Sequence, residues 1–89
     1  MARYQTPYPA IIEAAAQEGA PDALFQLGLL YCSGREVALD LVEAHKWFNL
    51  AALRGNPEAR RYRSEISAEM TRADIGRAQR AAREWLARH

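Results

Sequence analysis

Apolar residues recur every three or four positions along most of this chain, which is the spacing of one face of an α-helix. No segment shows the strict alternation of apolar and polar residues that predicts a β-strand. Start and stop signals divide the chain into five expected helices, at about 9–18, 21–32, 41–54, 57–70 and 72–87. The pattern therefore predicts an all-α fold. Because the loops are short, consecutive helices are expected to be antiparallel neighbours.

The expected helix ends carry recognisable signals. Asp40, Asn56 and Thr71 stand where an N-cap side chain accepts a hydrogen bond from a free backbone amide. Glu43 lies three residues after Asp40, and Asp74 lies three residues after Thr71. The helical faces differ: 21–32 is apolar nearly all round, whereas 57–70 has a narrow apolar stripe among charges and 72–87 is apolar on one side. Helices that are apolar on one side only are typical of the end of a stack of helices, where the polar side faces water.

The segment AAQEGAPDA at 15–23 recurs 36 residues later as AALRGNPEA at 51–59. Alanine, glycine and proline match, and an acidic residue follows each proline. Glycine after the last helical turn marks the end of one helix, and proline marks the start of the next. Recurrence of this unit at a period of 20 to 50 residues is typical of helical solenoids.

The segment ALFQLGLLYCSG at 23–34, followed by Val37, Asp40, AHKW at 44–47, AA at 51–52 and Gly55, resembles the Sel-one-like repeat, a relative of the tetratricopeptide repeats. The resemblance implies a helix pair per repeat and an α-α superhelix, here a short solenoid of about five antiparallel helices within one domain, 1–89. Residues 20–55 match one complete repeat. Residues 9–19 correspond to the end of a preceding unit, 56–70 to a divergent first helix of a following one, and 71–89 to a C-terminal capping helix.

Two departures from the family pattern stand out. Glu36 replaces a second glycine, so the loop is expected to be remodelled if the family's left-handed backbone cannot be kept there. Arg63 and Ser64 replace a Leu-Gly pair in the fourth helix, which fits a solenoid that stops at this point.

The resemblance assigns structural roles to the repeat positions. Gly28 is expected where the paired helix comes close, and Trp47 and Tyr31 are expected to supply large apolar areas. The full set of matched positions is Ala23, Leu27, Gly28, Tyr31, Gly34, Asp40, Ala44, Trp47, Ala51, Ala52 and Gly55.

The resemblance also implies a function: a non-enzymatic protein–protein interaction or adaptor module. In the related repeats the first helix of each pair lines a concave groove. The corresponding partner-binding positions here are Asp22, Phe25, Leu29, Cys32, Ser33, Glu58, Arg61 and Glu65. The expected ligand is a protein or peptide with an apolar anchor, and an acidic residue of it could pair with Arg61. The alternative for Phe25 and Leu29 is that they pack against the neighbouring helix.

Composition narrows the picture further. The chain has 89 residues, 49% of them hydrophobic, and 18 alanines, which favour closely packed helices. A net charge of +1 conceals an asymmetry: 1–53 carry three basic and six acidic residues, whereas 54–89 carry nine arginines against five acids. No apolar run is long enough for a membrane span or a secretory signal, so a cytoplasmic protein is expected. The single cysteine excludes an internal disulfide.

No catalytic, metal or cofactor site is expected. Cys32 has no histidine at a suggestive spacing and is interpreted as a structural thiol. His45 and His89 are interpreted as surface residues. Glu65 and Glu69 lie one helical turn apart but are interleaved with arginines, which favours a solvated face.

Two alternative functions remain open. The arginines of 54–89, with Tyr62 or Trp85 as stacking platforms, could bind nucleic acid, although glutamates interrupt the run. A chain with little more than one and a half repeats could also be a structural module that forms a homodimer. In that case a second copy covers the first helix; otherwise residues 1–8, with Tyr4 and Tyr8, are expected to fold back over it.

Overall fold

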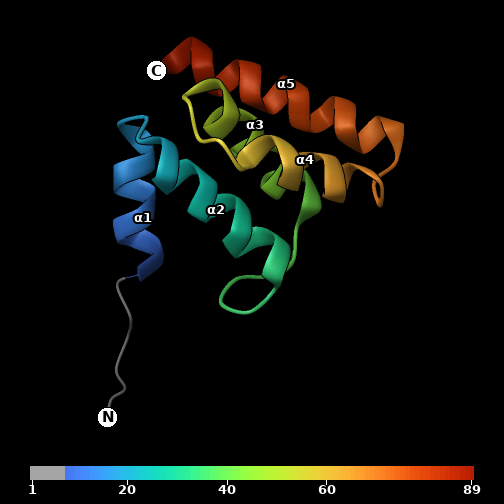
Figure 1. The fold of residues 1–89 in the computed structure, drawn as a ribbon, viewed down its shortest axis with the longest axis horizontal. Helices are drawn as coiled ribbons and strands as arrows, with labels where there is room; N and C mark the ends of the chain where they lie inside the picture. Colours follow the sequence, from blue (N-terminus) through green and yellow to red (C-terminus); the bar gives the residue numbers. More distant parts are fainter. Residues whose placement is uncertain (1–7) are drawn as a thin grey trace.

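A computed structural model describes residues 8–89, and these residues form five α-helices and no strand. The helices are α1 (Tyr8–Gln17), α2 (Pro21–Ser33), α3 (Leu41–Leu53), α4 (Ala59–Ser67) and α5 (Arg72–Arg88), shown in Figure 1. The all-α prediction is confirmed for this part of the chain. The expected fold-back of residues 1–8 over α1 involves Tyr4 and the side chain of Tyr8, which lie outside what the structure describes.

The repeated stop between helices has the same geometry in both copies. Gly19 and Gly55 both have a left-handed backbone, with φ of 83° and 106°. The amide of each glycine donates to the carbonyl three residues before it, and the next amide donates to the carbonyl five residues before itself. This is the Schellman arrangement, which satisfies the free carbonyls at a helix end and needs a residue without Cβ. The 36-residue repeat in the sequence is therefore also a repeat of backbone hydrogen bonds.

All three expected N-caps are confirmed. Asp40 Oδ1 accepts from the amide of Glu43 at 3.0 Å, and Thr71 Oγ1 accepts from the amide of Asp74 at 3.0 Å. Asn56 Oδ1 accepts from the amides of Glu58 and Ala59. The fourth helix is shorter than expected, since regular helix spans Ala59–Ser67 and 68–70 form a turn.

The core is centred on α3, which packs against α2, α4 and α5, while α1 packs against α2. Phe48 of α3 is completely buried, and its ring lies against the backbone of Gly28 in α2. A Cβ at Gly28 would lie within 3.0 Å of three atoms of that ring. The expected close approach of two helices at Gly28 is confirmed, although the atoms that come close are those of an aromatic ring.

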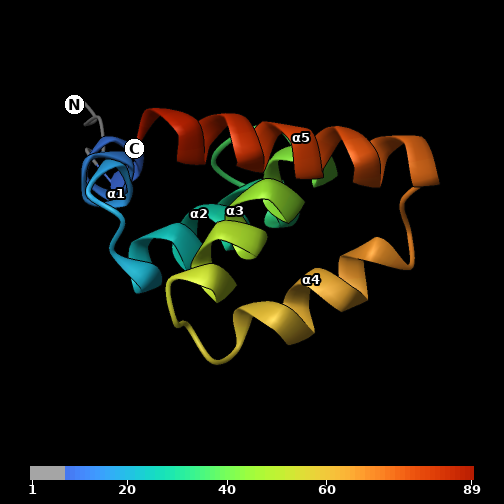
Figure 2. The same ribbon diagram turned by 90° about the horizontal axis from the view of Figure 1, so that it is seen from above.

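The path of α5 differs from the expectation that consecutive helices are neighbours. Instead of packing along α4, α5 lies along α3, with α4 on another side of α3 (Figure 2). The reason is the distribution of apolar surface: α5 buries Ala78, Ala82 and Trp85, whereas α4 buries only Ala59 completely. The Trp85 ring meets the Trp47 ring of α3 edge to face, with centroids 6.2 Å apart.

The C-terminal end of α5 reaches the turn between α1 and α2 (Figure 1). His89 stacks on Trp85 and its Nε2 contacts the side chain of Gln17. The guanidinium of Arg54 lies against Gly19 and over the Trp85 ring. The C-terminal end of α5 therefore packs against the turn between α1 and α2.

The backbone at Glu36, in the loop from α2 to α3, is not left-handed. Among residues 8–89, only glycines have a positive φ. Gly34 ends α2 with φ of 70°, and the amide of Asp40 donates to the carbonyl of Tyr31 at 3.0 Å. That hydrogen bond returns the chain to α2 just before α3 begins.

Candidate functional site

The predicted partner-binding positions lie on α2, on α4 and at Glu58 immediately before α4. An aromatic cluster, which we define as Phe25, Phe48 and Tyr62, joins the two helices, and we call the surface around it the α2–α4 face. Phe25 and Tyr62 meet edge to face, with centroids 5.1 Å apart, and each lies 5.6 Å from the Phe48 ring. Phe48 is sealed beneath the other two, which are half-buried. The two helices are thus joined into one surface by aromatic packing.

A second contact joins the same two helices at their N-terminal ends. Asn56 Nδ2 donates to Asp22 Oδ1 at 2.9 Å, while Asn56 Oδ1 caps α4. Asn56 occupies the position of Ala20 in the first copy of the repeated turn, and Asp22 follows the first proline. The asparagine in place of alanine is the only signal in the sequence for the link between Asn56 and Asp22, and this link was not predicted.

Replacing Asn56 with alanine is expected to lower the free energy of unfolding by about 1.5 kcal/mol, because a buried cap and the link to Asp22 are lost together. Urea unfolding followed by circular dichroism measures this loss. Thr71→Ala is the matched control, since it removes a single exposed cap bond at α5 and is expected to cost about 1 kcal/mol or less. Equal losses for both variants would mean that the Asp22 link contributes nothing.

Charged residues on the α4 side of the face are mutually paired. Arg61 bridges Glu58 at 3.3 Å and Glu65 at 3.6 Å, and its guanidinium also lies over the Tyr62 ring. All three charged side chains remain about 60% exposed. Arg61 is therefore already shared between two carboxylates, and these three side chains together carry one net negative charge. The i,i+3 and i,i+4 spacing of these residues indicates both ion pairs. The expectation that Arg61 receives an acidic residue of a ligand stays a prediction.

The predicted positions at the C-terminal end of α2 bond to their own helix. The Cys32 thiol donates to the carbonyl of Leu29 at 3.6 Å, and the Ser33 hydroxyl donates to the carbonyl of Leu30 at 3.1 Å. Burial raises the pKa of the Cys32 thiol, so the thiolate is disfavoured. Leu29 is half-buried, and Phe25 packs against the core. Phe25 therefore packs against the core and is also partly exposed, so it combines the two roles that the sequence left open for it.

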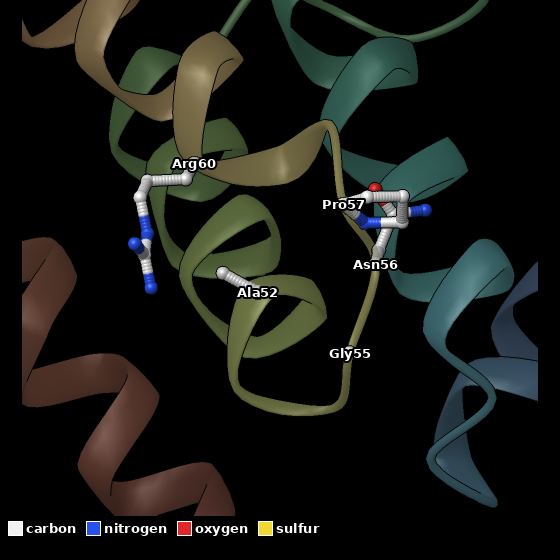
Figure 3. Close-up of a pocket in the computed structure, with 5 residues that line it drawn as sticks. All are labelled: Ala52, Gly55, Asn56, Pro57 and Arg60. Atoms are coloured by element: carbon white, nitrogen blue, oxygen red, sulfur yellow. The ribbon is translucent and has the colours of Figure 1, made fainter.

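A shallow pocket of about 310 Å³ lies at the turn between α3 and α4. Ala52, Gly55, Asn56, Pro57 and Arg60 line it (Figure 3). In Figure 3 the Arg60 side chain extends from α4 alongside α3, on the far side of the pocket from Pro57. The small side chain of Ala52 leaves this space, and the helix amides nearest to it are already capped by Asn56.

His45 was interpreted as a surface residue, and this prediction is wrong. The side chain is buried between α3 and α4, with 3% of the residue exposed. Its Nε2 lies 3.0 Å from Ser67 Oγ, and its Nδ1 is buried without a hydrogen-bond partner among the described residues. The signal in the sequence was its spacing of three and seven residues before Phe48 and Ala52, which places it on the α3 stripe facing α4. His89 is exposed, as expected.

Residues 8–89 were also compared with the requirements of metal sites and membrane spans. No three histidine, cysteine or acidic side chains in this range come together to hold a metal ion. Glu65, one of the two glutamates one turn apart, is bound to Arg61. Across the same residues, no helix has the length and apolar character needed to span a membrane.

The chain matched neither the models of known protein families nor any of the curated proteins with which it was compared.

Proposed function

We propose that this chain is a non-enzymatic protein–protein interaction module that binds a peptide or protein partner on the face of α2 and α4. The observation that carries the proposal is the contact between Phe25 and Tyr62, which joins two helices from successive units into one surface. Half-exposed aromatic rings surrounded by exposed polar side chains are typical of interaction surfaces. Leu29 extends the apolar strip along α2.

The architecture we propose is a short helical solenoid of the Sel-one-like type. Its support is the pair of identical stops at Gly19 and Gly55, 36 residues apart, and the Asp22–Asn56 link between the two units. In this proposal α2 and α3 form the complete repeat, and α4 is the first helix of the following one.

The charges suggest the chemistry of the partner. With Arg61 shared by Glu58 and Glu65, basic side chains of a partner fit the α4 edge, while an apolar residue packs beside Phe25 and Tyr62. Complementary charge of this kind chiefly selects the partner and speeds its association.

The test uses a photo-reactive cross-linker placed at Glu65, and for comparison at Glu84 on α5, in the native lysate. We expect protein partners to be captured from position 65 and not from position 84, and untagged wild-type protein to compete with the capture. The double variant Glu58→Lys, Glu65→Lys should fail to compete, because it reverses the charge of the face at two exposed positions. Capture that is equal at both positions, or that the variant competes with as well as wild type does, would contradict the proposal.

The alternative of nucleic-acid binding has weaker support. Arg54, Arg61, Arg63 and Arg77 already contact other groups of the protein. Trp85 is buried. The Tyr62 ring is half-exposed, but the Arg61 guanidinium lies over it, which leaves little of its face for stacking bases. We expect no salt-sensitive binding of mixed DNA or RNA oligonucleotides in a retardation assay at low salt.

The homodimer alternative rests on α1. Ile11 of α1 is 62% exposed, and the neighbouring Ala10 and Ala14 are exposed as well. Light scattering at micromolar concentration distinguishes a dimer from a monomer.

A further inference from the structure

α4 is the helix of this fold with the least independent support. It has nine residues, and only Ala59 is fully buried. Isolated helices shorter than about 12 residues are marginal in water, so α4 depends on its contacts with α2 and α3. The N-terminal half is fastened by the Asn56 cap and by Tyr62 in the aromatic cluster. The C-terminal half is fastened to α3 by Arg63, which donates to Asn49, and by Ser67 on His45.

The hydrogen bonds around His45 fix its protonation. The hydroxyl of Ser67 donates its single hydrogen to the carbonyl of Arg63, at 2.8 Å. Ser67 Oγ can therefore only accept from His45, so Nε2 of His45 carries the hydrogen and Nδ1 is bare. Nδ1 is buried and faces no acceptor among the described residues. A second proton on the ring would be a buried donor without a partner, which is costly.

The charges around His45 oppose protonation as well. Burial, and after it the positive charge of Arg63 on α4, lowers the pKa of His45 below the ordinary value of 6.5. On α3 itself, Glu43 is held by Lys46 and by Trp47 Nε1. On α5, Asp74 is paired with Arg77, and α2 carries no charged residue after Asp22. In the part of the chain that the structure describes, no carboxylate bonds to the His45 ring.

We propose that His45 and Ser67 form an acid-sensitive clasp, and that protonation of His45 releases α4 from α3 while the rest of the fold stays intact. Two segments keep α4 attached to the fold: the Asn56 turn before it and α5 after it. Neither depends on the contact between His45 and Ser67. Release uncovers the completely buried ring of Phe48, because Tyr62 of α4 is one of its two aromatic covers. This inference does not depend on the proposed function, although release would also dismantle the α2–α4 face.

The direction of the pH effect follows from the lowered pKa. The released form has an ordinary histidine and binds the proton more readily than the docked form. Docking is therefore complete above about pH 6.5 and weakens as the pH falls below that value.

The test is amide hydrogen exchange at about pH 7 and about pH 5, corrected for the intrinsic effect of pH on exchange. We expect the opening of 59–67 to increase several-fold at the lower pH, with an upper limit of about thirtyfold set by the titration of one histidine that has an ordinary pKa in the released form. Amides in the middle of α2 and α3 should keep their protection. A parallel NMR titration of the imidazole signals should show His45 titrating together with the α4 amides.

Two variants serve as controls. His45→Gln can still donate to Ser67 but does not titrate, so it should abolish the acid response of α4. His89→Gln, at the exposed histidine, should leave the response unchanged. The proposal is overturned if α4 opens equally at both pH values, if α2 and α3 open together with it, or if His45→Gln retains the response. If His45→Gln does not fold, the imidazole titration of the wild-type protein decides: α4 shifts that do not follow His45 overturn the proposal.

Discussion

Trp85→Ala is expected to lower the free energy of unfolding by about 4 kcal/mol, the largest effect of any single substitution considered. Trp85 is buried and contacts three parts of the fold: Trp47 in α3, the Arg54 guanidinium and the His89 ring. Its loss leaves α5 held chiefly by alanines. A domain of this size has a total stability on the order of 5–10 kcal/mol, so the variant approaches the limit of folding.

Thermal unfolding measures this effect, and the melting temperature should fall by roughly 20 °C. Leu86→Ala, at the adjacent and partly exposed position, is expected to cost less than about 1 kcal/mol. Trp85→Phe is informative because the indole Nε1 is buried without a partner, so phenylalanine gives up no hydrogen bond. A Leu86→Ala loss as large as that of Trp85→Ala would show that α5 is not anchored through the tryptophan.

Gly28→Ala is expected to lower the free energy of unfolding by about 3 kcal/mol, although alanine is the better helix former. The added methyl would lie within 3.0 Å of the Phe48 ring. That ring is fully buried and packs against Phe25 and Tyr62, so it cannot move aside without disturbing the aromatic cluster. Chemical unfolding of the purified variant measures the loss.

Gly76→Ala in α5 is the matched control. A Cβ at this helical glycine would meet only the end of the Arg80 side chain, at 3.7 Å. The variant is therefore expected to gain about 0.5–1 kcal/mol through helix propensity alone. Combining Gly28→Ala with Phe48→Leu should cost less than the sum of the two single changes, because the smaller side chain makes room for the methyl. Strict additivity would argue against the clash.

The helices, their caps and their stops could be predicted from the sequence. Asp40, Asn56 and Thr71 cap helices as expected, and Gly19 and Gly55 end them with the same hydrogen bonds. These features depend on contacts between residues no more than about five positions apart, so a short stretch of sequence contains both partners. The close approach at Gly28 was also predictable, but only through the family resemblance.

Of the predicted site positions, Phe25 of α2 is in contact with α4, through Tyr62, which was not among the predicted positions. The ion pairs of Arg61 with Glu58 and Glu65 were not predicted, although their spacing is local. The burial of His45 was missed although its spacing from Phe48 and Ala52 indicated it, whereas its hydrogen bond to Ser67, 22 residues away on another helix, had no local signal.

By itself the sequence determined the five helices of 8–89, the positions of their ends except those of α4, and the 36-residue recurrence of the turn, since all of these follow from local hydrogen bonds and side-chain periodicity. Only the tertiary structure decided that α5 lies along α3 instead of α4, that Asn56 joins Asp22, and that His45 is sealed without a partner for Nδ1. Each of these depends on which apolar faces bury one another. That choice is made by the packing of the whole chain, and no local pattern contains it.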